Sequence, residues 1–116
     1  MKHQHAISFK HATHGIITAF TTQPNFRIHT LIGLAVIISG YFLAISTQEW
    51  LILVLTMTFV VVTELINTSI EAVVDLITEQ HNQYAKIAKD VAAAAVLSSA
   101  ISSIIIGLII FLPKII

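Results

Sequence analysis

Three carboxylates and one amide interrupt the second of three long apolar runs in the chain. These residues are Glu64, Asn67, Glu71 and Asp75. An α-helix turns by about 100° per residue, so the four side chains fall within roughly 80° of its circumference and share one narrow stripe, here called the acidic stripe. Ionisable residues at membrane depth are costly, and they usually face a partner, water or a substrate.

Two interpretations of the acidic stripe are open from the residues alone. It could be a structural polar seam that joins membrane helices. Three acids on one stripe, however, repel each other unless a cation lies among them. Mg²⁺ binds carboxylate and phosphate oxygens. The composition of the stripe therefore favours a metal–phosphate site.

The composition is that of an integral membrane protein. Apolar residues make up 56% of the 116-residue chain and charged residues only 10%, with a mean hydropathy of +0.89. A water-soluble domain carries about 25% charged residues. The net charge is zero and cysteine is absent, so we expect neither nucleic-acid binding nor thiol or disulfide chemistry. The polar N-terminus lacks the apolar core of a signal peptide.

Hydrophobic periodicity predicts an all-α membrane protein with one domain over residues 1–116. Ser8 could cap an amphipathic helix over about residues 8–22, which would lie in the membrane surface. Pro24 should end that helix, because the residue before proline is pushed out of the helical region. The apolar runs then predict three membrane-spanning helices. These spans cover about residues 28–46, 50–77 and 91–112, and residues 79–90 are expected to form a polar loop.

Basic residues predict the orientation. Lysine and arginine on one side of the predicted membrane outnumber Lys114, which is alone on the other side. The residues on the richer side are Lys2, Lys10, Arg27, Lys86 and Lys89. The positive-inside rule places the N-terminus and the polar loop in the cytoplasm. The acidic stripe would then lie toward the cytoplasmic leaflet, where ATP is available.

Small residues recur every fourth position in the third span, at Ala95, Ser99, Ser103 and Gly107. Such spacing lets helix backbones approach closely, so this small-residue stripe predicts helix–helix packing and not chemistry. Three spans make a thin bundle that can hardly enclose a site alone. We therefore expect a homo-oligomer.

Two sequence blocks resemble the prokaryotic diacylglycerol kinase family, which includes the undecaprenol kinases of Gram-positive bacteria. The stronger evidence is ELINTSIEAVVD at residues 64–75, followed by AKIAKDVAAAAVL at residues 85–97. Phe9-Lys10 with Gly15, and NFRIH at residues 25–29, are weaker matches in the right order. The resemblance covers about residues 8–113.

The resemblance implies a small homotrimer in the bacterial inner (cytoplasmic) membrane, with sites between chains, a surface helix and three spans in each chain. Family members transfer the γ-phosphate of ATP to the hydroxyl of a membrane lipid, using Mg²⁺. On this basis Glu64 would be the general base and Glu71 a metal ligand. The resemblance further implies that Asn67, Asp75, Lys89 and Asp90 lie at the nucleotide, and that Phe26 and Arg27 lie on the lipid side.

Two positions depart from the family pattern. Gln23 stands where the family usually has a glutamate that is a second metal ligand, and His11 stands where it has a nucleotide-contacting tyrosine. An amide oxygen can still bind a cation, but it is a weaker Mg²⁺ ligand than a carboxylate. Gln23 is therefore expected in the metal shell with reduced affinity, and His11 near the nucleotide.

Two function classes follow from these features. The first is a lipid kinase that acts on undecaprenol or diacylglycerol; residues 26–29 and 86–90 look more like the undecaprenol branch. The alternative is a non-catalytic or weakly active membrane assembly protein or ion-conducting oligomer, with the acidic stripe facing a pore. A pore should not need Lys89, whose compact charge suits phosphate oxygens.

Overall fold

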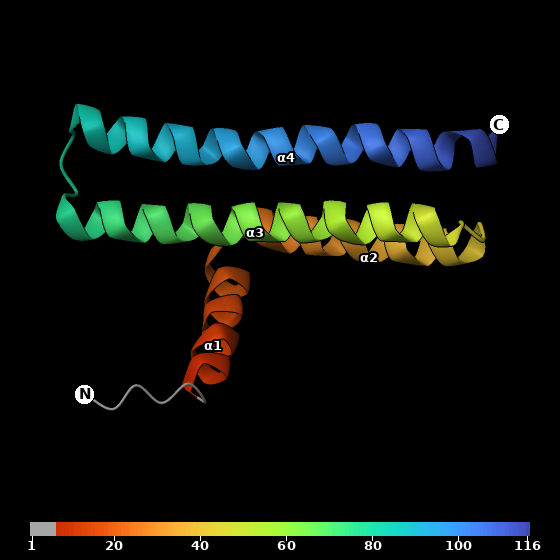
Figure 1. Ribbon diagram of the computed structural model, residues 1–116. Coiled ribbons are helices and arrows are strands. Elements are labelled where there is room, and N and C mark those ends of the chain that lie inside the picture. The colour runs from red at the N-terminus through yellow and green to blue at the C-terminus, as the bar shows by residue number, and fades with distance from the viewer. Residues whose placement is uncertain (1–6) are drawn as a thin grey trace.

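Four α-helices form the fold in the computed structural model, which describes residues 7–116 (Figure 1). They are α1 (Ile7–Thr22), α2 (Pro24–Phe42), α3 (Thr47–Ile77) and α4 (Gln83–Ile115). No strand occurs within that range. The last three helices are long and apolar enough to cross a membrane. The predicted fold class, a surface helix followed by three membrane helices, is confirmed; Lys2, His3 and His5 lie outside the described residues.

Helix α1 projects away from the bundle, whereas α2, α3 and α4 run alongside one another (Figure 1). The break falls at Gln23, whose extended backbone (φ −113°, ψ 104°) precedes Pro24 in the first turn of α2. Arg27 Nη1 donates hydrogen bonds to the carbonyls of Phe20 (2.8 Å) and Thr21 (3.2 Å). Because these carbonyls end α1, Arg27 holds the elbow between α1 and α2. Ser8 lies inside α1 and does not precede it, since helical geometry already holds at residue 7.

Helix α2 ends at Phe42, four residues before the expected end of the first span at residue 46. The early end has two causes. Ala44 adopts a left-handed backbone (φ 50°), and Ser46 begins α3 with a capping box that it shares with Glu49. Gly40 lets the two helices meet, because a Cβ there would lie 2.9 Å from Trp50 Cη2. The turn between α2 and α3 is therefore tightly packed.

Helices α3 and α4 form a hairpin that is much longer than α2. They contain 31 and 33 residues against 19 in α2, which at 1.5 Å per residue is about 47 and 50 Å against about 29 Å. The hairpin consequently extends well past the start of α2 (Figure 1). The expected polar loop at 79–90 is shorter in the structure, because Asn82 Oδ1 accepts from the backbone N–H of Tyr84 (2.9 Å) and Ala85 (3.2 Å) and starts α4 at Gln83.

A polar contact joins α3 to α4 inside the hairpin. The hydroxyls of Thr63 and Ser99 lie 2.9 Å apart, and Ser99 is only 1% exposed. The small-residue stripe of α4 therefore packs, at Ser99, against α3 of the same chain. Figure 1 shows the two helices side by side along their whole length. This contact helps to hold the rotation of α3, and with it the direction in which the acidic stripe points.

Candidate active site

Glu64 is the one charged residue that is buried within the described chain, at 2% exposure. It lies near the middle of α3, opposite the first turns of α2. Its Oε1 lies 3.4 Å from Nδ1 of His29 on α2, and both of these atoms are buried without a hydrogen-bond partner. Burying a carboxylate without full pairing is expensive, so a side chain kept in this state is a candidate functional group.

Asn67 and Glu71 follow Glu64 on the same face of α3. Asn67 Nδ2 donates a hydrogen bond to Glu71 Oε1 (3.2 Å), while Asn67 Oδ1 is buried and has no hydrogen-bond partner. An amide oxygen and a carboxylate are thus placed together, and one of them is an unused acceptor. These are hard oxygen donors of the kind that Mg²⁺ prefers.

The donors of this chain fit a Mg²⁺ ion that is shared with a phosphate. Within residues 7–116 no cluster of three or more His, Cys, Asp or Glu side chains could hold a metal ion by itself. Magnesium in phosphoryl-transfer sites usually has one or two carboxylate ligands, with phosphate and water completing the shell. Glu71 and the free oxygen of Asn67 could supply the protein's share of such a shell.

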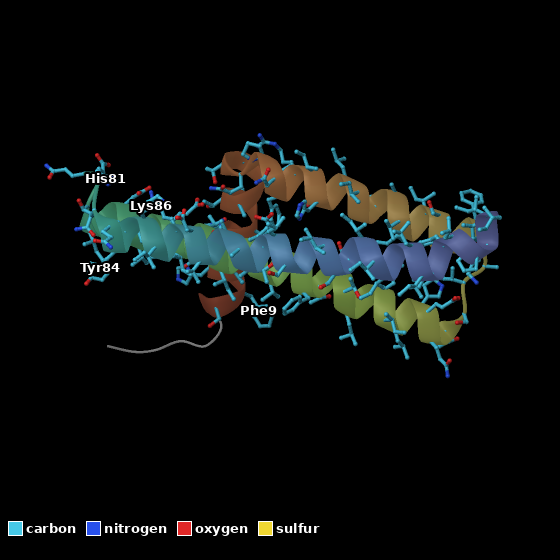
Figure 2. All side chains as sticks on the ribbon, turned by 90° about the horizontal axis from the view of Figure 1, so that it is seen from above. Phe9, His81, Tyr84 and Lys86 are labelled. Carbon is cyan, nitrogen blue, oxygen red and sulfur yellow. The ribbon has the colours of Figure 1, made fainter. Side chains whose placement is uncertain are left out.

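Asp75 and Lys89 link the two helices of the hairpin nearer its loop. Lys89 Nζ donates to Asp75 Oδ1 at 2.7 Å, and the side chains are 42% and 54% exposed. Asp90 pairs with Lys86 one turn away on α4. These residues line a polar pocket of about 230 Å³ with the loop between the helices. His81, Tyr84 and Lys86 project outward at this end in Figure 2. The pocket therefore presents positively and negatively charged side chains at the loop end of the acidic stripe.

An apolar groove lies beside the acidic stripe and meets it at Asn67. It has a volume of about 460 Å³ and runs between α3 and α4, where Asn67 is one of its few polar residues. Much of its α4 wall is formed by alanines at 88, 92 and 95. A groove lined by such small apolar residues can accommodate a lipid chain or the helix of a second copy.

No hydrogen bond or ion pair of the described chain joins the remaining predicted site residues to the acidic stripe. His11 is exposed on α1, the same helix as Phe9 in Figure 2. Phe26 is a core residue at 5% exposure, and Arg27 is occupied with the carbonyls that end α1. The side chain of Gln23 reaches only Thr22 Oγ1, at 3.5 Å.

Gln23 nevertheless lies at the depth of Glu71. The contact between His29 and Glu64 gives a common reference depth for the two helices. Gln23 lies six residues before His29 on the α2 side, and Glu71 lies seven residues after Glu64 on α3. Helices α2 and α3 run in opposite directions (Figure 1), so both offsets point to the same end, by about 9 and 10 Å at 1.5 Å per residue.

Sequence reasoning missed the role of His29 as the neighbour of Glu64. The available signal was its type and place, because it is the one titratable residue in the apolar run from Ile28 to Ser46 apart from Tyr41 near the far end. A polar residue in such a run needs a partner in the folded protein.

Comparison with known proteins identifies the family of the chain. Residues 10–111 match the family model of prokaryotic diacylglycerol kinase. The chain belongs to this family. It is an ATP-dependent lipid kinase, which sets aside a purely structural or ion-conducting assembly as its function.

Curated relatives of this lipid kinase carry two substrate names. The chain is 48% identical over 107 residues to an undecaprenol kinase of Bacillus subtilis, and the match covers 92% of this chain and 87% of the relative. It is 45% identical over 108 residues to a diacylglycerol kinase of Synechocystis, covering 92% of this chain but 62% of the relative. A diacylglycerol kinase of Helicobacter pylori is 38% identical over 81 residues, 70% of this chain and 63% of the relative. The identities alone do not separate the two substrates.

Proposed function

We propose that this lipid kinase transfers the γ-phosphate of ATP to the hydroxyl of undecaprenol, giving undecaprenyl phosphate, with diacylglycerol and phosphatidic acid as the second substrate and product. The observation that carries the chemistry is the buried carboxylate of Glu64, held on one helix face with Asn67 and Glu71. The choice of undecaprenol is supported by the near full-length match to an undecaprenol kinase.

Glu64 is the proposed general base. Its Oε1 is buried and faces His29 at 3.4 Å. The other oxygen, Oε2, is therefore the one that we propose accepts the proton of a lipid hydroxyl. A base must lie within hydrogen-bond reach of the proton it removes. The depth of Glu64 suits a hydroxyl at the head of a membrane lipid, because a lipid chain can remain in the apolar groove between α3 and α4.

Glu71 and Asn67 are the proposed magnesium ligands, and Gln23 is a weaker third. When bound, Mg²⁺ would neutralise charge on the phosphates, which phosphoryl transfer needs more than covalent participation. Lys89 and Asp90, with Asp75, would bind ATP in the polar pocket near the loop. His11 on α1 would approach the nucleotide from the membrane surface, and Phe26 and Arg27 would shape the lipid side by fixing the start of α2.

The distribution of lysines around the site supports a cytoplasmic nucleotide. Lys86 and Lys89 lie at the loop end of the hairpin, while Lys114 lies at the opposite end, 3.3 Å from Glu49. The positive-inside rule then places the loop and the N-terminus in the cytoplasm. We further propose that the kinase works as a homotrimer in the bacterial cytoplasmic membrane, with each site completed by a neighbouring copy.

A direct assay tests the proposed substrate. Purified protein in mixed micelles receives labelled ATP and Mg²⁺, with undecaprenol and diacylglycerol offered separately at equal mole fractions. We expect labelled lipid phosphate from both lipids and a higher kcat/KM with undecaprenol. Equal or higher kcat/KM with diacylglycerol would reverse the substrate assignment, and ATP consumption that is independent of lipid would contradict the transfer reaction itself.

Gln23→Glu should lower the Mg²⁺ concentration needed for half-maximal rate. The reason is that a carboxylate at the depth of Glu71 adds a charged oxygen ligand. One charge about 4 Å from the ion, at an effective dielectric near 20, is worth up to ~4 kcal/mol before desolvation, and a quarter of that is about fivefold in affinity. The measurement is rate against free Mg²⁺ at saturating ATP.

Gln48→Glu is the matched control for Gln23→Glu, because it adds the same charge on the exposed first turn of α3, at the opposite end of the hairpin from the polar pocket. Its half-saturating Mg²⁺ should stay close to that of the parent. If Gln23→Glu leaves this concentration unchanged or raises it, residue 23 lies outside the metal shell.

A further inference from the structure

The closest charged or titratable neighbour of the buried Glu64 is a histidine on another helix. His29 Nδ1 lies 3.4 Å from Glu64 Oε1, and no other ion pair or hydrogen bond of the described chain involves the Glu64 side chain. The separation is a few tenths of an ångström longer than a hydrogen bond. Catalytic hydrogen bonds are often long when no substrate is present, so a small movement would bring the two atoms into contact.

The two side chains differ in their exposure at the surface of the single chain. The Glu64 side chain is 3% exposed and the His29 side chain is 23% exposed. Nδ1 of His29 is itself buried, so the exposed part of the ring lies away from Glu64. His29 therefore lies between the buried carboxylate and the surface of the chain, in the second turn of α2.

The proposed transfer leaves a proton on Glu64 in every turnover. The lipid O–H bond breaks as its oxygen bonds to the γ-phosphorus, and the bond from that phosphorus to the bridging oxygen breaks, with its electron pair leaving on ADP. The proton passes to the carboxylate of Glu64. The base must lose this proton before it can act again, and a side chain that is 3% exposed has little direct contact with water.

We propose that His29 returns this proton to solvent. The O–H bond forms on Oε2, and rotation of the protonated carboxyl group turns it toward His29. The neutral imidazole accepts the proton at Nδ1, which restores the carboxylate, and the imidazolium loses its Nε2 proton to water. Exchange of the remaining proton through water returns the ring to the Nε2–H tautomer, which can accept at Nδ1 again. This inference rests on the proposed function. His29 acts through Glu64 and does not touch the lipid or ATP. Histidine suits the task because its unperturbed charge change falls near neutral pH.

No other titratable side chain of residues 7–116 forms a hydrogen bond or ion pair with the Glu64 side chain. Glu71 is the other carboxylate close along α3, but it is engaged by Asn67 Nδ2 at 3.2 Å. The hydroxyl of Thr68 donates to the backbone carbonyl of Glu64 and not to its side chain. Arg27, two residues from His29, donates to the carbonyls that end α1.

Pre-steady-state kinetics test the relay. The variant His29→Gln keeps a polar side chain of similar reach but cannot carry a proton. Rapid quenching with labelled ATP, in micelles of the lipid that the parent prefers, should show a first turnover at nearly the parental rate. Later turnovers should be about tenfold to 100-fold slower, at or below the lower end of the 10²–10⁴-fold range of general acid–base contributions. The product formed in the fast phase should equal one lipid phosphate per site.

A second variant separates proton transfer from placement of the base. In His29→Ala, added imidazole should accelerate the later turnovers and leave the first turnover unchanged. His14→Gln, on the exposed face of α1, is the matched control and should behave as the parent does with and without imidazole. Circular dichroism of each variant checks that the helices are intact.

The outcomes are distinct. If the first and later turnovers slow together in both variants, and imidazole restores neither, His29 only places Glu64 and the relay is wrong. Parental kinetics in both variants would also exclude it. If the parent forms no lipid phosphate with either lipid, the proposed function fails before the relay is reached.

Discussion

Replacing Glu64 with glutamine should abolish lipid phosphorylation while ATP binding is retained. Glutamine keeps the size of the side chain in its buried place but removes the group that accepts the proton. General-base contributions run to about 10²–10⁴-fold in rate, so kcat should fall by at least about 100-fold. The affinity for ATP should change little, because Asp75 lies eleven residues farther along α3, about 16 Å away.

The matched control for Glu64→Gln is Glu49→Gln at the other end of α3. Glutamine at this place can still complete the capping box with Ser46, and Glu49 pairs with Lys114 far from the acidic stripe. Labelled-ATP transfer and nucleotide binding are measured on both variants. Activity of Glu64→Gln within twofold of the parent would remove Glu64 from the mechanism.

Replacing Lys89 with glutamine should raise the KM for ATP by about tenfold to 100-fold. A charge-assisted hydrogen bond to phosphate is worth about 1.5–3 kcal/mol, and each 1.4 kcal/mol is a factor of ten in affinity. The loss of the Asp75–Lys89 ion pair should matter much less, because both side chains are partly exposed and such pairs contribute about 0–1 kcal/mol to stability.

Two measurements distinguish a nucleotide-binding lysine from a purely structural one. The KM for ATP should rise for Lys89→Gln, whereas its thermal unfolding in detergent should stay near that of the parent. Lys114→Gln removes an equivalent ion pair at the opposite end of the molecule, and its KM should be unchanged. A large loss of stability with an unchanged KM would show that Lys89 only joins α3 to α4.

The sequence determined those features that depend on a single helix. Apolar runs and the break at Pro24 are local, so they predicted the helical class and the end of α1 at Thr22. The common face of Glu64, Asn67 and Glu71 also follows from helical periodicity alone, and the hydrogen bond between the last two agrees with it. The family blocks are likewise contiguous stretches, and the family assignment drawn from them is confirmed.

The boundaries of the connections were less accessible from sequence. The end of α2 depends on the left-handed backbone at Ala44 and on the close packing of Gly40 against Trp50. The polarity of residues 83–90 suggested a loop, but the Asn82 cap makes the segment helical. Polar composition describes exposure to water, and an exposed segment can be helix or loop.

Only the tertiary structure decided which residues of different helices meet. His29 and Glu64 are far apart in the chain, and their contact depends on the depth and rotation of α2 against α3. The pairing of Asp75 with Lys89 depends in the same way on the α3–α4 hairpin, which the Thr63–Ser99 contact helps to hold. Helical periodicity gives the direction of each side chain around its own axis, but the relative placement of two axes comes from the packing of all the side chains between them.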